Sequence, residues 1–232
     1  MIPISTTAPR SDRSPIVVYA VVAVCSMVFL WQMNLSGDAA LRFMAEYALI
    51  PRRYEDPAWA LRLGLNPGDY APLLTSTVLH GGWLHLIFNM WTLWLFGRAV
   101  EARMGTGRFL LLYTFSALLA GYAHMLAYPA STTPVIGASG AIAGILGAHA
   151  SLFPAARIIL LIPIIIIPLF LPISAFWYVA LWFGFQVWQG AGSLGQVTGG
   201  GVAWWAHIGG FIAGLIFVRA LTPPKGLGQF PN

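Results

Sequence analysis

The stretch VIGASGAIAGILG, residues 135–147, is apolar and rich in glycine, and it contains one serine, Ser139. Its glycines recur at short intervals, at Gly137, Gly140, Gly144 and Gly147. Glycines at this spacing leave one side of a helix without side chains, so that a second helix can approach its backbone closely. We therefore predict that this stretch forms a helix in tight contact with another helix.

Ser139 follows Pro134 near the expected start of this helix. The first backbone N–H groups of a helix have no intrahelical acceptor, and they can stabilise an oxyanion beside a hydroxyl nucleophile. A nucleophilic serine also needs a base, and the segment AHIGGFIAG, residues 206–214, provides His207. That segment has small residues at four-residue spacing, Ala206, Gly210 and Gly214. The sequence thus predicts that Ser139 and His207 meet on two closely packed helices.

The composition is typical of a membrane protein that crosses the bilayer several times. The chain has 232 residues, of which 58% are hydrophobic and only 8% are charged. Soluble domains have about a quarter of their residues charged. The net charge of +5 comes from few residues and gives no reason to expect a nucleic-acid partner, so the expected surroundings are membrane lipid. The single cysteine, Cys25, excludes an internal disulfide, and we interpret it as a packing residue.

Hydrophobic segments of about 20 residues each predict six transmembrane helices, and hence an all-α membrane helix bundle over residues 15–221. The expected spans are 15–34, 83–103, 108–128, 136–153, 172–190 and 202–221. The first is too long for a cleavable signal peptide. Residues 1–14 and 222–232 are expected to be a cytoplasmic N-terminal segment and a cytoplasmic tail.

A further apolar run, residues 158–171, contains Pro163 and Pro168 and is followed by Pro172. Prolines at this density break helices. We therefore expect an interfacial or re-entrant segment that leads into the fifth span. A seventh span in this place is the alternative.

The distribution of basic residues predicts that both ends of the chain lie in the cytoplasm. With six spans, the residues at the cytoplasmic side are Arg10, Arg13, Arg98, Arg103, Arg108, Arg157, Arg219 and Lys225. Loop one, residues 35–82, carries arginines on the outer side, but it is long enough for the rule to weaken. Because this loop mixes leucines and Trp59 with charged residues, we expect it at the outer membrane surface.

Polar residues within spans are costly and indicate function. His85 and Asn89 are four residues apart at the start of the second span, so they share one helix face. In this topology they lie at a depth similar to that of Ser139 and His207. We expect His207 to accept the proton of Ser139 as general base. His85, Asn89, Gly137 and the backbone N–H of Ser139 would form the oxyanion site.

Other polar residues have simpler explanations. We expect no third member of a triad, because no aspartate lies within a span, and we expect helix packing to orient His207. His124 and His149 are interpreted as packing residues. His80 either caps the approach to the second span or assists the site. The many tryptophans are expected to pack or to lie at the membrane interface.

Four motifs together resemble those of the rhomboid family, in order and spacing, over residues 75–220. They are HGGWLHLIFNM at 80–90, the pair Glu101 and Arg103, GASG at 137–140 and AHIGG at 206–210. The resemblance implies a six-span core with the catalytic part at about 75–221. It also implies an intramembrane serine protease with a Ser139–His207 dyad and with His85 and Asn89 at the oxyanion.

The family further implies cleavage of single-span membrane proteins near the outer membrane face, without a metal or cofactor. Two features depart from the usual pattern. Many rhomboids have an aromatic residue four positions after the serine, where this chain has Ala143. Many also have a Trp-Arg pair before the second-span motif, where this chain has Ala71-Pro72.

Two other classes of function compete with this interpretation. A catalytically silent relative that binds membrane helices for quality control would be expected to lack the serine or the histidine. A transporter or proton channel would be expected to have charged residues near mid-membrane and an internal repeat, and the sequence has neither. The sequence leaves the oligomeric state undetermined. We also expect the fifth span, with Phe176, Trp177 and Trp182, and the glycine-rich loop 190–201 to form a gate.

Overall fold

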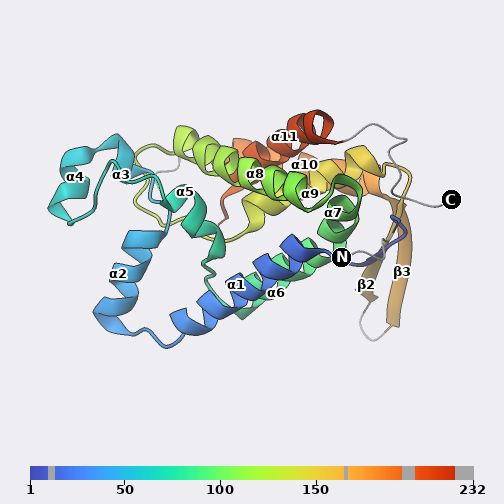
Figure 1. The fold of residues 1–232 in the computed structure, drawn as a ribbon, viewed down its shortest axis with the longest axis horizontal. Helices are drawn as coiled ribbons and strands as arrows, with labels where there is room; N and C mark the ends of the chain where they lie inside the picture. The colour runs from blue at the N-terminus through green and yellow to red at the C-terminus, as the bar shows by residue number, and fades with distance from the viewer. Residues whose placement is uncertain (10–13, 165–166, 195–201, 223–232) are drawn as a thin grey trace.

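The computed structural model describes residues 1–9, 14–164, 167–194 and 202–222. It shows a bundle of helices with a small β-sheet at one end (Figure 1). The mainly helical prediction is confirmed. The all-α class is wrong in one respect, because the apolar, proline-containing run after the fourth predicted span forms strands.

The long helices follow the predicted spans closely. They are α1 (Ile16–Gln32), α6 (Trp83–Thr92), α8 (Thr106–Ala127), α9 (Ser139–Leu152), α10 (Ala175–Gly192) and α11 (Trp204–Leu221). The second predicted span continues from α6 through a π-helical segment, η2 (Leu93–Gly97), into α7 (Arg98–Met104). The helix of the fifth predicted span, α10, begins at Ala175 and not at residue 172, because residues 172–174 belong to a strand.

Within the described residues, α8 and α11 are long and apolar enough to cross a membrane. The helices α1 and α9 are apolar but shorter. The count of six spans therefore stays a prediction.

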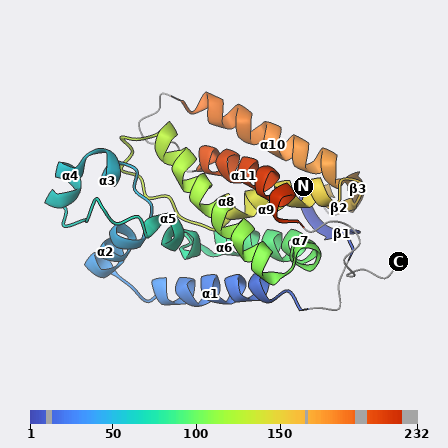
Figure 2. The same ribbon diagram turned by 45° about the horizontal axis from the view of Figure 1, so that its top comes forward.

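Helix α9 lies at the centre of the bundle, against α8 and α11 (Figure 2). Every residue of α9 from Gly140 to His149 is buried. A Cβ on Gly210 would overlap the backbone oxygen of Gly140, and one on Gly214 would overlap that of Gly144. The predicted close approach of two glycine-bearing helices is thus present, and it fixes the relative position of α9 and α11.

The pair Glu101 and Arg103 lies in α7. The buried carboxylate of Glu101 accepts hydrogen bonds from the N–H groups of Val17 and Val18, both at 3.0 Å. These are among the amides at the start of α1 that have no intrahelical acceptor. Glu101 therefore fastens α1 to the second predicted span, and Arg103 is half-buried in the last turn of the same helix.

Loop one is built from short helices. They are α2 (Gly37–Tyr47), α3 (Arg52–Glu55), α4 (Pro57–Arg62), α5 (Pro72–Thr75) and the 3₁₀ turn η1 (Ser76–Val78). The fully buried Arg53 joins them, because its guanidinium binds the Asp69 carboxylate at 3.1 Å and the backbone oxygens of Glu46 and Asn66. The location of loop one at the outer membrane surface stays a prediction.

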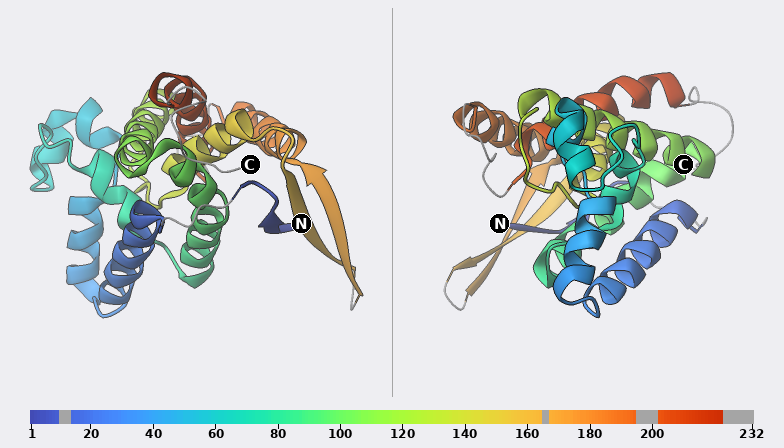
Figure 3. Two further views of the ribbon diagram at one scale, coloured as in Figure 1. Left: turned by 45° about the vertical axis from the view of Figure 1, so that its right-hand side comes forward. Right: turned by 90° about the vertical axis from the view of Figure 1, so that its left-hand side faces the viewer.

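The sheet has the order β1-β2-β3, with β1 (Ile2–Thr6), β2 (Arg157–Ile164) and β3 (Ile167–Ser174), all antiparallel. Residues 158–164 and 167–171 form no helix, as their prolines predict, but they are regular strands, and the interfacial or re-entrant position of this run stays a prediction. Pro163 lies opposite Pro168, so this pair exchanges no hydrogen bonds, and bonded pairs alternate from there. Pro172, opposite Ile159, then also occupies a non-bonded position where a missing N–H has no cost to the β2–β3 ladder. The β2–β3 hairpin projects from the bundle (Figure 3).

Candidate active site

Ser139 is the first residue of α9, and the preceding turn shapes its surroundings. Gly137 has a φ of 112°, a conformation that residues with a Cβ rarely adopt. Its N–H donates to the Ser76 backbone oxygen at 2.9 Å. Gly137 therefore shapes the turn before Ser139, but its own N–H is already hydrogen-bonded within the protein. The first helical hydrogen bond of α9 comes from the N–H of Ile142, so the amides before it, including that of Ser139, have no intrahelical acceptor.

His207 lies in the first turn of α11 and faces Ser139. Its Nε2 is 2.9 Å from the Ser139 hydroxyl oxygen, which is hydrogen-bonding distance. The structure thus brings the two predicted reacting residues together. The neighbouring contact between Gly140 and Ala206, where a Cβ on Gly140 would lie 3.6 Å from the Ala206 oxygen, keeps the two helix starts side by side.

The other ring nitrogen of His207, Nδ1, lies 2.7 Å from Oε1 of Gln186 on α10. The sequence interpretation missed this residue, because it looked only for an aspartate as a partner of the histidine. The signal was present: Gln186 is a polar residue within a segment predicted to be a membrane span.

His85 and Asn89 of α6 lie across from the turn before Ser139. A Cβ on Gly137 would be 2.6 Å from His85 Nε2 and 3.4 Å from Asn89 Nδ2, so both side chains reach this glycine. The Gly81 N–H donates to His85 Nδ1 at 3.4 Å, which leaves Nε2 to carry the proton. Asn89 Nδ2 is buried and has no acceptor within the described residues. Two side-chain donors thus converge beside the serine.

These residues line one cavity of about 470 Å³. Its lining includes Ser139, His207, His85, Asn89 and also His124. The interpretation of His124 as a packing residue alone was therefore incomplete, because α8 ends at the same level of the bundle as the starts of α9 and α11. His149 matches its interpretation: it is fully buried and packs edge-on against Phe96, with ring centroids 5.0 Å apart.

An aromatic ring lies beside His207 although Ala143 cannot supply one. The ring centroid of Trp182 on α10 is 6.0 Å from that of His207, and Trp204 lies 6.3 Å away at a right angle. Ala143 itself is fully buried. The fifth predicted span therefore provides a ring at the histidine.

The aromatic residues of the fifth predicted span, which is expected to be part of a gate, include two groups. Phe176 and Trp177 are 52% and 59% exposed, so they do little to hold α10 against the bundle. Trp182 and Phe183 pack against Phe211 of α11, with ring centroids 6.2 Å and 4.2 Å away. The gate stays a prediction, and residues 195–201 of its expected loop lie outside the described residues.

His80 is buried just before α6, and its ring lies edge-on to His85 with centroids 5.1 Å apart. Burial, with a smaller contribution from neighbouring His85, lowers the pKa of His80 to about 4. His80 is therefore neutral at physiological pH and supports the ring of His85 by contact.

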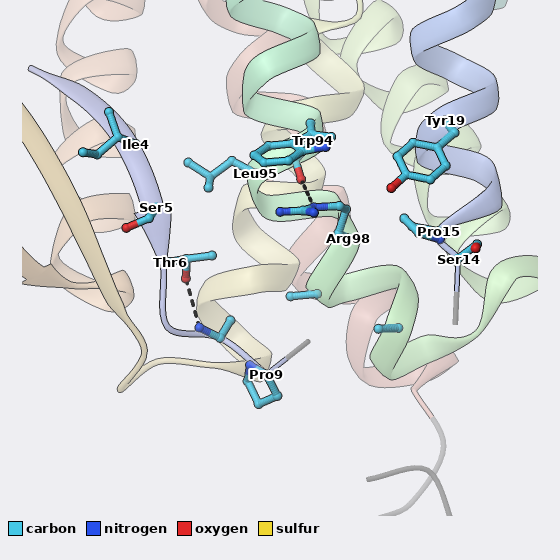
Figure 4. Close-up of a pocket in the computed structure, with 13 residues that line it drawn as sticks. Ile4, Ser5, Thr6, Pro9, Ser14, Pro15, Tyr19, Trp94, Leu95 and Arg98 are labelled. Carbon is cyan, nitrogen blue, oxygen red and sulfur yellow. Dashed lines mark hydrogen bonds between the residues drawn. The ribbon is translucent and has the colours of Figure 1, made fainter. Parts of the chain in front are cut away.

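A second cavity, of about 270 Å³, lies at the end of the bundle near β1 (Figure 4). Arg98 stacks on Trp94, with its guanidinium carbon 3.6 Å from the ring centroid, and its Nε donates to the Trp94 backbone oxygen. The lining includes hydroxyl groups but no histidine among the residues that the structure describes. This cavity therefore offers no counterpart to the serine–histidine pair. The described residues also contain no cluster of three or more side chains suited to hold a metal ion.

Comparison with known proteins decides the family. The family model of the Rhomboid domain matches residues 67–224, which include every residue of the site. The chain belongs to the rhomboid family. It is 30% identical over 206 residues to the mitochondrial Rhomboid protein 1 of Saccharomyces cerevisiae, covering 86% of this chain and 51% of that protein.

Bacterial rhomboids are similar as well. The chain is 36% identical over 160 residues to the rhomboid protease GluP of Bacillus subtilis, covering 68% of this chain and 27% of that protein. It is 27% identical over 221 residues to the rhomboid protease GlpG of Salmonella paratyphi A, covering 94% of this chain and 68% of that protein. The matched part is about half the length of the yeast relative.

Proposed function

We propose that this rhomboid is an intramembrane serine endopeptidase that cleaves single-span membrane proteins within or near their transmembrane segment. The observation that carries the proposal is the 2.9 Å contact between His207 Nε2 and the Ser139 hydroxyl, at the wall of a cavity. The relatives named as proteases support the reaction class.

The reaction that this geometry supports begins with attack of Ser139 Oγ on the peptide carbonyl carbon. As that bond forms, the hydroxyl proton moves to His207 Nε2, and the carbonyl oxygen becomes an oxyanion. Donors from His85 Nε2, Asn89 Nδ2 and the Ser139 amide would stabilise it. The C–N bond then breaks, and His207 returns the proton to the leaving amine. Water, deprotonated by His207, attacks the acyl carbon. The C–O bond to Ser139 then breaks, and His207 returns the proton to the Ser139 oxygen, which regenerates the free enzyme.

We further propose six spans, with both termini in the cytoplasm and the site near the outer face of a bacterial plasma membrane. The positive-inside rule supports this orientation. Among the described basic residues, Arg98 and Arg103 of α7 lie at the end of the second span, whereas His85 and Asn89 lie at its start. The site and the basic residues of this span therefore lie toward opposite ends of the span.

A catalytically silent protein that binds membrane helices is the second candidate. The test is to incubate the purified protein in liposomes with a labelled single-span substrate, beside a Ser139→Ala variant. We expect wild type to cleave and Ser139→Ala to leave the substrate intact. Equal cleavage by both proteins would contradict the proposal, and binding without cleavage by both would favour the silent alternative.

A further inference from the structure

Gln186 is a buried polar side chain of α10, 4% exposed, that reaches the active site. Its Oε1 lies 2.7 Å from Nδ1 of His207. An amide oxygen can only accept a hydrogen bond, so Nδ1 has to carry the proton. Nε2 then has its lone pair free for the hydroxyl proton of Ser139, 2.9 Å away. The contact with Gln186 therefore selects the tautomer that a general base needs.

The aromatic neighbours of His207 cannot make this selection. Trp182 and Trp204 pack near the imidazole ring, with centroids 6.0 Å and 6.3 Å away, and they restrict its tilt. Ring packing does not distinguish a protonated ring nitrogen from an unprotonated one, because the two tautomers have nearly the same shape. A hydrogen-bond acceptor at Nδ1 does distinguish them.

We propose that Gln186 is a positioning residue that completes a Ser139–His207–Gln186 triad. This inference rests on the proposed function. Gln186 Oε1 holds the Nδ1–H tautomer before the reaction, and it stays bonded to the Nδ1 proton when Nε2 takes up the second proton. In serine proteases with an aspartate at this place, the acceptor has the same two tasks. The neutral amide does so here without a buried charge, which in the membrane would be costly.

The alternative is that Gln186 is merely a buried side chain that uses His207 to satisfy its amide. Three variants separate the two roles. Gln186→Leu keeps about the same size and removes the acceptor, and Gln186→Glu keeps an acceptor and adds charge. Gln189→Leu is the matched control, because Gln189 lies one turn further along α10 and its side chain makes no hydrogen bond within the described part of the chain.

The measurement is cleavage of the labelled single-span substrate in liposomes, as kcat and KM across pH, with thermal unfolding of each variant. For Gln186→Leu we expect kcat to fall roughly 10- to 100-fold with little change in KM. This loss is part of the rate enhancement of about 10²–10⁴-fold that a positioned general base contributes. The acidic limb of its pH profile should move to lower pH, because protonated His207 loses an acceptor. For Gln186→Glu the limb should move to higher pH, because a carboxylate stabilises the protonated ring.

A purely structural role would lower the unfolding temperature without moving the acidic limb. That result, or wild-type kcat in Gln186→Leu, would overturn the inference. Ser139→Ala is measured in the same series. If Ser139→Ala is as active as wild type, the proposed function fails. If Ser139→Ala is inactive and Gln186→Leu behaves like Gln189→Leu, only the role of Gln186 fails.

Discussion

Gly210 packs directly against the backbone carbonyl of Gly140, so that a Cβ on Gly210 would overlap that oxygen. We predict that Gly210→Ala forces α9 and α11 apart and lowers stability by about 1–3 kcal/mol, the usual cost of overpacking. Because Ser139 and His207 lie one residue before Gly140 and three before Gly210, activity should fall as well. Thermal unfolding and substrate cleavage in detergent measure the two effects.

The control is Gly184→Ala on α10, where an added Cβ would meet no atom within 4 Å. This change should leave stability unchanged or slightly higher, since alanine favours helix more than glycine does. Equal behaviour of the two variants would show that the glycine contact does not hold the helices in place.

Asn89 carries a buried amide group with no described acceptor beside the serine. We predict that Asn89→Ala lowers kcat by up to about 10²-fold, the typical loss for one oxyanion donor, with little change in KM. Steady-state kinetics with the single-span substrate measures both constants. An effect on KM alone would assign Asn89 to substrate binding.

The carboxylate of Glu101 holds the first amides of α1, those of Val17 and Val18. Glu101→Gln leaves only one acceptor oxygen for two buried donors, so we expect a loss of about 1–3 kcal/mol in unfolding free energy. Urea unfolding compares this variant with Glu55→Gln, which changes an exposed carboxylate. If both variants unfold like wild type, the contact does not stabilise α1.

Several elements could be predicted from the sequence because local pattern determines them. The second, fourth and sixth predicted spans run in the same direction. Near their starts lie His85 and Asn89, Ser139 and His207, so the order of the spans alone brings these residues to a similar depth. The glycine spacing in α9 and α11 predicts their close contact for the same reason.

The parts that could not be predicted depend on tertiary structure. The run 158–171 contains prolines that break helices, yet they fit strand positions where no N–H is needed in the hairpin ladder, and only the pairing shows this. Gln186 lies in a helix whose sequence does not reveal which face meets His207. His124 looked isolated because its neighbours in the cavity come from other helices.

The β2–β3 hairpin has no polar side chain from Ile158 to Ile173, and it projects from the bundle (Figure 3). Ile167 and Phe170 are 68% and 55% exposed. Because a membrane protein can cover such a surface with lipid, we predict that it contacts acyl chains. A fluorophore on Phe170→Cys in liposomes should be quenched by spin-labelled lipid.

Thr132→Cys is the matched position, exposed in the loop before α9. Its fluorophore should respond instead to a water-soluble quencher, and wild type sets the background because its only cysteine, Cys25, is buried. Stronger quenching of position 170 by the aqueous quencher would place the hairpin in water.

The most direct test of the account is covalent labelling of the nucleophile. Wild-type protein is treated with a serine-reactive phosphonate, digested, and the modified residue is located by mass spectrometry. We predict one adduct on Ser139, absent in Ser139→Ala, strongly reduced in His207→Ala and unaffected by a chelator. A label on another residue, or full labelling of Ser139 without His207, would contradict a serine activated by this histidine.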